Sequence, residues 1–138
     1  MTETRSNRAP TPVGPYPHAR RVGQLLFVSG TGSRVPGTNE IPGNVVGPDG
    51  TVVAHDIERQ TRQCFANIRT ILEDAGSSWE RIVDVTVFLT DMKGDFAAFN
   101  RVYAEYFAAI GPTRTTVEVR ALPTPIAVEL KCIAWLGA

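Results

Sequence analysis

The spacing of hydrophobic residues along the 138-residue chain changes several times between a strand-like and a helix-like period. Residues 24–30 form a short apolar run that ends in glycine, and residues 51–54 form another, so both are predicted to be strands of one sheet. From Asp56 to Gly76 the apolar side chains recur at spacings of three and four, which is typical of an amphipathic helix. Asp56 can cap the start of this helix, and Gly76 can end it.

The second half of the chain repeats this alternation. The β-branched run from Ile82 to Leu89 predicts a buried strand, and a second helix is predicted to start near Asp95 and to stop at Gly111-Pro112. Residues 113–119 and 126–135 then predict two final strands. The expected fold is α/β (α+β), with a single mixed sheet and two helices that cover one of its faces.

The final strands are apolar on both of their faces, although the two helices can cover only one. A sheet that is buried on both faces needs a second cover, which another subunit can supply. The pattern therefore predicts an oligomer with clefts between its subunits.

Two segments lie outside the periodic pattern. Residues 1–12 are polar and are expected to be a flexible lead-in to a single domain, residues 1–138. Residues 31–50 are rich in glycine and proline, and a loop of about twenty residues in a compact domain is usually functional. We interpret this loop as facing a substrate, with an ordinary surface excursion as the alternative.

Composition narrows the class of protein. The 14 basic and 14 acidic residues balance, so no basic excess favours a nucleic-acid partner. Cys64 and Cys132 form no Cys-x-x-Cys pair and are interpreted as structural, and with only two histidines a zinc site is poorly supported. No apolar run approaches the ~20 residues of a membrane span, and the amino terminus lacks the apolar core of a signal peptide. We expect a cytoplasmic protein whose partners are small molecules or copies of itself.

Two charged residues lie where a strand would be buried. Glu129 is surrounded by apolar residues, and a lone buried carboxylate is costly unless it is paired. Arg114, in the preceding predicted strand, is its natural partner, either directly or through a ligand. An arginine matches a carboxylate with two hydrogen bonds, so this pair can bind an acidic metabolite and place an acid or a base beside it. The arrangement indicates an enzyme site.

A series of short motifs gives the chain a resemblance to a known family. The chain is similar to the Rid/YjgF family of imine and enamine deaminases in segments that run in order over residues 13–134. These segments are Val13-Gly14-Pro15-Tyr16, Leu26 to Gly30, Asn67 with Ile71-Leu72 and Ala75-Gly76, Val83 to Leu89 with Asp91, Phe99-Asn100-x-x-Tyr103, Pro112-Thr113-Arg114, and Leu122-Pro123 leading to Val128-Glu129.

The resemblance implies a chorismate-mutase-like fold and a barrel-like homotrimer, alone or as a dimer of trimers, with three active sites at subunit interfaces. Residues 14–21, 40–43 and 122–129 resemble in particular the 2-aminomuconate deaminase type within the family.

The resemblance also implies roles for individual residues. Arg114 matches the arginine that grips the substrate carboxylate, with a surface ion pair to Glu118 as the alternative. Glu129 matches the carboxylate that orients or deprotonates the attacking water, with a purely structural pairing as the alternative. Thr116 stands where many relatives have cysteine, so a covalent thiol mechanism is set aside, although the backbone there can still hold the water. Further matches to pocket-lining positions, each of which also has an ordinary packing interpretation, are Tyr16, Ser29, Phe88 and Asn100.

Two features extend beyond the common pattern. His18 replaces the family's usual glutamine and is a candidate proton donor, with a polar surface residue as the alternative. Because 2-aminomuconate has two carboxylates, a site for it needs a second cation, and the sequence offers Arg20, Arg21 and Arg34 without choosing among them.

The function that these features predict is hydrolytic deamination of an enamine or imine without metal or organic cofactor. The expected reaction converts 2-aminomuconate to 4-oxalocrotonate and ammonia in the breakdown of aromatic compounds. The alternatives are a general deaminase of 2-iminoacids and 2-aminoacrylate, and a non-catalytic trimer that binds 2-ketoacids. RNA cleavage is a poor alternative, because the net charge is zero.

Overall fold

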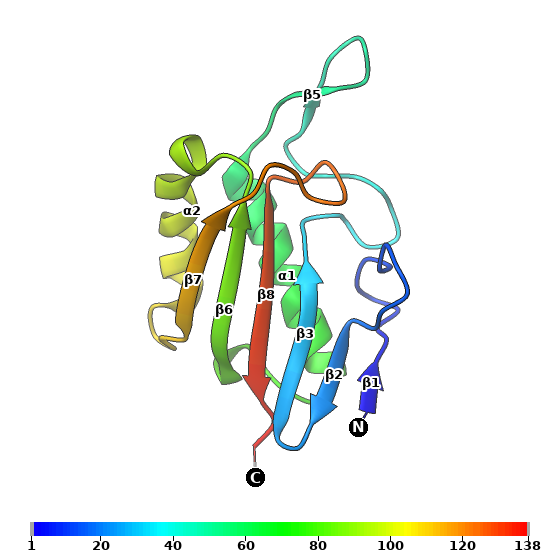
Figure 1. Ribbon diagram of the computed structural model, residues 1–138, viewed down its shortest axis with the longest axis vertical. Coiled ribbons are helices and arrows are strands. Elements are labelled where there is room, and N and C mark those ends of the chain that lie inside the picture. Colours follow the sequence, from blue (N-terminus) through cyan, green and yellow to red (C-terminus); the bar gives the residue numbers. More distant parts are fainter. Residues whose placement is uncertain (1, 138) are drawn as a thin grey trace.

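The computed structural model describes residues 2–137 and shows a six-stranded sheet with two long helices packed on one face (Figure 1). This arrangement confirms the predicted α/β (α+β) class. The elements are β1 (Thr2–Thr4), β2 (Ala19–Val22), β3 (Leu25–Thr31), β4 (Val45–Val46), β5 (Val52–Ala54), α1 (Ile57–Asp74), the 3-10 helix η1 (Trp79–Arg81), β6 (Ile82–Leu89), α2 (Met92–Phe107), β7 (Thr113–Glu118) and β8 (Val128–Trp135).

The main sheet has the strand order β1-β2-β3-β8-β6-β7. All neighbouring strands of this sheet are antiparallel except β6 and β7. These two are parallel because α2, which connects them, carries the chain back to the end of the sheet where β6 began. Strand β7 therefore forms one edge of the sheet, beside α2, and β8 lies near the middle (Figure 1).

The ends of α1 agree with the predicted signals. Asp56 has an extended backbone, and its side chain accepts a hydrogen bond from the backbone N–H of Arg59. Gly76, just past the helix, has a positive φ of 84°, which a residue with a side chain adopts only at a cost. The start of α2 was predicted one turn too late, because Asp91 and not Asp95 is the residue that caps it, by accepting from the N–H of Gly94.

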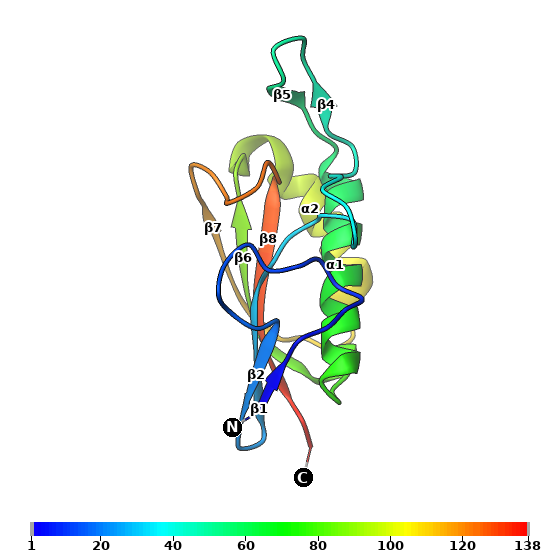
Figure 2. The same ribbon diagram turned by 90° about the vertical axis from the view of Figure 1, so that its right-hand side faces the viewer.

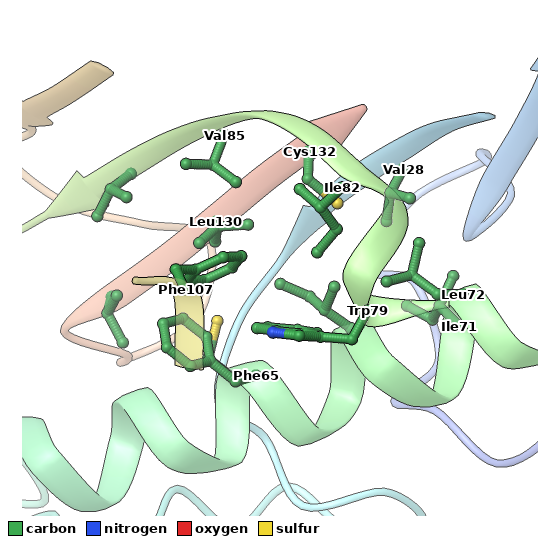
Figure 3. Close-up of a cluster of buried hydrophobic side chains, with 14 of the residues drawn as sticks. Val28, Phe65, Ile71, Leu72, Trp79, Ile82, Val85, Phe107, Leu130 and Cys132 are labelled. Atoms are coloured by element: carbon green, nitrogen blue, oxygen red, sulfur yellow. The ribbon is translucent and has the colours of Figure 1, made fainter. Parts of the chain in front are cut away.

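The hydrophobic core lies between the sheet and the two helices. Side chains of Val28, Val85 and Leu130 from three neighbouring strands meet Phe65 and Leu72 of α1 there (Figure 3). Full burial of each such side chain contributes about 1.5–3 kcal/mol relative to an exposed position. An aromatic cluster around Phe65 joins α1 to α2 and η1, with ring contacts to Trp79, Phe99, Tyr103, Tyr106 and Phe107.

The opposite face of the sheet carries large apolar side chains that the helices do not cover. Both helices lie on the same side of the sheet (Figure 2). On the other side Leu25, Phe27, Val117 and Trp135 are each between 37% and 45% exposed, on the three strands β3, β7 and β8. This uncovered apolar face agrees with the sequence pattern that predicts a second cover.

The structure corrects two predictions about the segments outside the core elements. Residues 52–54 do not join the main sheet: β5 pairs only with β4, and the resulting hairpin projects from one end of the molecule (Figures 1 and 2). The segment expected to be a flexible lead-in contains β1, which pairs with the unpredicted strand β2, followed by the buried residues Ser6 and Ala9. Among residues 2–137, no helix is both long enough and apolar enough to cross a membrane.

Candidate functional site

Arg114 lies on the edge strand β7 and points toward the helices. It is paired in register with Val85, whose side chain is fully buried on the helix side of the sheet, so both side chains share that face. Its guanidinium carbon lies 4.4 Å from the ring centre of Tyr103 and 5.2 Å from that of Phe99. Such stacking fixes the plane of the guanidinium and leaves its edge free to donate hydrogen bonds.

The side chain of Thr116 orients this arginine. Arg114 Nε donates to Thr116 Oγ1 at 2.7 Å, and the two residues share a face because they are two positions apart on one strand. The surface ion pair with Glu118 is not formed, since that carboxylate accepts instead from the backbone N–H of Met92 at 3.0 Å. Burial lowers the pKa of Arg114, and within residues 2–137 its guanidinium makes no ion pair. The charge is therefore partly desolvated and lacks an anion.

Two polar atoms on α2 face the same region without a hydrogen-bond partner among the described residues. They are Asn100 Oδ1 and the hydroxyl of Tyr103, and both atoms are buried. The two residues are neighbours on one helical face because they are three positions apart. Buried polar atoms are nearly always satisfied, so an unsatisfied acceptor and hydroxyl beside an unpaired guanidinium indicate a place for a ligand. We call Arg114, Thr116, Asn100 and Tyr103 the arginine half-site.

Glu129 lies on β8 and points toward the other face of the sheet. It is in register with Phe88, which alternates with the buried core residues Val87 and Leu89. Burial raises the pKa of the Glu129 carboxyl, and the positive charge of Lys131 lowers it to a smaller extent. A raised pKa makes the ionised carboxylate a stronger base than an exposed glutamate.

The surroundings of Glu129 form a small cavity of about 40 Å³. Gly30 lies against the carboxylate so closely that an added Cβ would be 2.7 Å from one of its oxygens, so a side chain at this position would displace the carboxylate. Tyr16 and Arg34 line the same cavity. We call Glu129, Tyr16, Gly30 and Arg34 the glutamate half-site. Its remaining lining residues are Val13, Gly32, Pro123, Thr124 and Ile126.

The two half-sites are apart within one chain. Strand β6 separates β7 from β8, which places Arg114 and Glu129 roughly 10 Å apart across the sheet, and the three-residue offset between Val85 and Phe88 adds roughly 10 Å along it. Their side chains also point to opposite faces. The direct pairing of Arg114 with Glu129 that the sequence suggested is therefore wrong within a single chain.

His18 does not face either half-site. It is 6% exposed, its Nδ1 accepts from the backbone N–H of Ser6 at 3.0 Å, and its Nε2 lies 2.8 Å from the carbonyl oxygen of Pro10, to which it donates. Both ring nitrogens are thus engaged with the backbone of the amino-terminal segment. The expected role as a proton donor to substrate is corrected to a structural one.

The other candidate residues are placed as follows. Ser29 donates its hydroxyl hydrogen to the carbonyl of Pro17 at 2.8 Å and supports the chain next to Tyr16. Arg20 and Arg21 lie exposed on β2, and Arg21 donates to the carbonyl of Gly23. Of the three arginines that the sequence offered as a second cation, the structure brings only Arg34 beside Glu129.

A second cavity contains neither Arg114 nor Glu129. It measures about 610 Å³ and lies between the base of the β4–β5 hairpin and the segment before β8, where His55 and Arg120 line it. It shares Pro123, Thr124 and Ile126 with the cavity beside Glu129. We assign the candidate chemistry to the half-sites and not to this cavity, because the unsatisfied atoms and the desolvated charges lie there.

Both cysteines are buried, as expected of structural residues. Burial raises the pKa of the Cys132 thiol to about 12 and raises that of Cys64 as well, so neither is a ready nucleophile. Tyr103 is the site residue that sequence reasoning missed, since it was considered only as part of the Phe99-Asn100-x-x-Tyr103 motif and was given no role in the site. The signal that could have revealed it is its hydroxyl, because a buried tyrosine hydroxyl needs a hydrogen-bond partner that apolar neighbours cannot supply.

Comparisons with known proteins place the chain among close relatives. Residues 6–136 match the family model described as Endoribonuclease L-PSP. A RutC family protein of Pyrococcus abyssi is 41% identical over 131 residues, covering 94% of this chain and 93% of that protein. Reactive Intermediate Deaminase A of Arabidopsis thaliana is 35% identical over 131 residues, covering 95% of this chain and 64% of that protein. The crystal structure of Escherichia coli TdcF with bound serine is 33% identical, with a TM-score of 0.83 and 98% of each chain covered.

Proposed function

Because the chain belongs to the Rid/YjgF family, which the Endoribonuclease L-PSP model describes, we propose that it is a hydrolytic deaminase of enamines and imines. The observation that carries this proposal is the arginine half-site, where a partly desolvated guanidinium without an anion lies beside two unsatisfied buried polar atoms. A carboxylate-bearing substrate supplies the missing partners. The relative named as a reactive intermediate deaminase and the relative crystallised with serine support a small ligand of this kind.

The complete site is proposed to form between subunits of a homotrimer. Arg114 and Glu129 are separated by β6 and face opposite sides of the sheet, so one chain cannot place both against one small molecule. A second copy that covers the apolar face can bring its glutamate half-site to the arginine half-site of the first. In a closed ring every subunit then contributes one half to each of two sites.

The proposed reaction begins with substrate orientation. Arg114 binds the carboxylate next to the reacting carbon with two hydrogen bonds, and Thr116 and the ring of Tyr103 hold the guanidinium in place. An enamine substrate first tautomerises to the imine, which exposes an electrophilic carbon. Asn100 Oδ1 and the hydroxyl of Tyr103 are available to form hydrogen bonds with the imine nitrogen or with the attacking water.

Hydrolysis then needs one base and one proton shuttle. Ionised Glu129 takes a proton from a water molecule as the oxygen bonds to the imine carbon, and the nitrogen is protonated to give a carbinolamine. Glu129 then moves the hydroxyl proton of the carbinolamine to its amino group, the carbon–nitrogen bond breaks, and ammonia leaves as the ketone forms. The side chains orient the reactants and carry the proton, and neither Cys64 nor Cys132 takes part.

The proposed substrate is 2-aminomuconate, which would yield 4-oxalocrotonate and ammonia. Support comes from the segment around the glutamate half-site, where a further arginine lines the cavity beside Glu129. A short 2-iminoacid or 2-aminoacrylate needs only Arg114, and deamination of such compounds is the alternative.

Ammonia release tests the activity directly. We would measure it from freshly generated 2-aminomuconate and from 2-aminoacrylate, with wild type, Arg114→Ala and Glu129→Gln. We expect faster turnover of 2-aminomuconate by wild type and loss of at least ~100-fold in each variant, because Glu129→Gln removes the general base and Arg114→Ala removes the two-bond contact to the substrate carboxylate. A preference for 2-aminoacrylate would make the protein the general deaminase.

Two other outcomes would change the class of function. Ligand binding by the wild type with no ammonia release above the uncatalysed background would favour a 2-ketoacid-binding trimer. The family model's description names an endoribonuclease, but a net charge of zero gives no electrostatic support for RNA binding. RNA binding that weakens steeply with salt would revive that alternative.

A further inference from the structure

Arg34 is a cation held beside Glu129 without an anion of its own. It lines the same small cavity as Glu129 and Tyr16, yet among residues 2–137 it forms no ion pair with that carboxylate or with any other. A cation and a base that share a cavity without contact leave room for a ligand group between them.

The position of Arg34 is fixed from two directions. Its backbone carbonyl accepts a hydrogen bond of 2.8 Å from Nδ2 of Asn67, which is 1% exposed on α1. Its guanidinium donates through Nη2 to the carbonyl oxygen of Thr11, in the amino-terminal segment. A guanidinium has five N–H donors, so this tether orients the group and leaves several donors for an anion.

We propose that Arg34 binds the distal carboxylate of a dicarboxylic enamine and thereby sets the specificity of the site. This inference rests on the proposed function, in which Arg114 of one subunit binds the carboxylate next to the reacting carbon. Arg34 enters the site with Glu129 from the neighbouring subunit, so the two arginines hold the two ends of the substrate. A monocarboxylic substrate lacks the group that Arg34 binds.

Arg120 provides a matched control. It lines the larger cavity on the other side of Pro123, Thr124 and Ile126, which the two cavities share, and it is exposed. It carries the same charge near the same segment but does not line the cavity of Glu129. A general loss of positive charge would therefore affect Arg34→Ala and Arg120→Ala alike, whereas a specific contact affects only the former.

The test compares two substrates across these variants. With Arg34→Ala we expect kcat/KM for 2-aminomuconate to fall about 10- to 100-fold, the loss of one charge-assisted contact, and kcat/KM for 2-aminoacrylate to change less than about threefold. Arg34→Lys should recover part of the loss, and Arg120→Ala should change neither. Equal losses on both substrates, no loss on either, or a selective loss in Arg120→Ala would overturn the proposal.

A binding experiment keeps the proposal separate from the proposed function. In the Glu129→Gln background, calorimetry would compare adipate with hexanoate, which differ by one terminal carboxylate. We expect adipate to bind at least about tenfold more tightly, and Arg34→Ala to remove that advantage while thermal unfolding shows the variant folded. If wild type deaminates neither substrate, the proposed function fails, and an adipate advantage that persists in Arg34→Ala would still overturn the role of Arg34.

Discussion

At Glu129, burial against Gly30 and the neighbouring apolar side chains raises the carboxyl pKa, and this sets the pH dependence of the proposed reaction. The base must be ionised, so kcat/KM should fall as the pH drops through this raised pKa, earlier than for an exposed glutamate. Measurement of kcat/KM against pH should show the acidic limb in wild type. An acidic limb at the ordinary pKa of an exposed glutamate would contradict the desolvated base.

The same residue should lower stability at neutral pH. Because the folded-state pKa is raised, the folded protein binds more protons than the unfolded chain between the unfolded and folded pKa values, so stability falls as the pH rises through that window. Above it, Glu129→Gln should unfold at a slightly higher temperature than wild type, and the difference should vanish at low pH. Calorimetric scans at several pH values check the sign, and a variant less stable at neutral pH would disagree with it.

Thr116 is a positioning residue for Arg114. Its hydroxyl oxygen accepts from Arg114 Nε at 2.7 Å, so Thr116→Val keeps the shape but leaves that N–H unpaired. We expect kcat/KM to fall about tenfold, since a hydrogen bond to a charged group contributes about 1.5–3 kcal/mol. Thr116→Ser restores the acceptor and should retain most of the activity. A loss as large in serine as in valine would assign the effect to the methyl group and not to the hydroxyl.

Between elements, one buried side chain joins the hairpin, the loop before β8 and the end of β3. Gln60 of α1 is fully buried; its Oε1 accepts from the backbone N–H of Ala127 at 2.8 Å and from the hydroxyl of Ser33. Its Nε2 donates to Oδ1 of Asn44 at 2.8 Å, and Asn44 in turn donates to the carbonyl of Pro125. This network holds the segment that leads to Glu129.

Replacement of Gln60 by methionine should therefore be costly despite the similar size. The substitution leaves the N–H of Ala127 and the side chains of Ser33 and Asn44 without their partner. We expect the free energy of unfolding to fall by about 2–4 kcal/mol, because each unsatisfied buried group costs about 1–3 kcal/mol. Urea denaturation measures the change. Glu73→Ala, on an exposed position of the same helix, is the control and should stay within about 0.5 kcal/mol of wild type.

Polar contacts also hold the β4–β5 hairpin and the amino-terminal segment against the helices. His55, the residue after β5, has its Nε2 2.7 Å from Asp95 Oδ2 and so attaches the end of the hairpin to α2. Asp74, at the end of α1, accepts from Ser6 and Arg8, and these contacts lower the pKa of its carboxyl. Segments that look irregular in the sequence are thus held by polar contacts over long separations in the chain.

At the scale of the whole molecule, the uncovered apolar face and the two separated half-sites predict that no single chain is active. The sharpest check is complementation between two inactive variants. Coexpressed Arg114→Ala and Glu129→Gln chains should assemble into mixed trimers in which some interfaces combine an intact Arg114 with an intact Glu129. Random mixing should restore about a quarter of the wild-type activity, since each site needs the two kinds of chain in a fixed order.

Each variant alone should form a trimer by light scattering and release no ammonia above background. No recovery in the mixture would mean that both residues serve the same site from one chain. Recovery without a trimer would contradict the ring and favour another assembly.

The sequence alone was sufficient where the deciding forces are local. The spacing of hydrophobic residues depends only on residues that are close in the chain, and so do the start of α1 at Asp56 and its end at Gly76. Both long helices, β3 and the last three strands could therefore be predicted. The amphipathic pattern also indicated an uncovered face. It could not show that β5 pairs with β4, because partners in a sheet are chosen by contacts between distant parts of the chain.

The candidate site divides in the same way. The residue types at Arg114 and Glu129, a guanidinium and a carboxylate in otherwise apolar strands, were enough to predict a site that binds a carboxylate-bearing metabolite. Only the tertiary structure decided that they face opposite sides of the sheet, that both nitrogens of His18 are engaged with the backbone, and that Arg34 alone among the candidate arginines lies beside Glu129. The sequence determines which chemical groups the protein has. Strand order, register and long-range hydrogen bonds determine which of those groups lie next to each other.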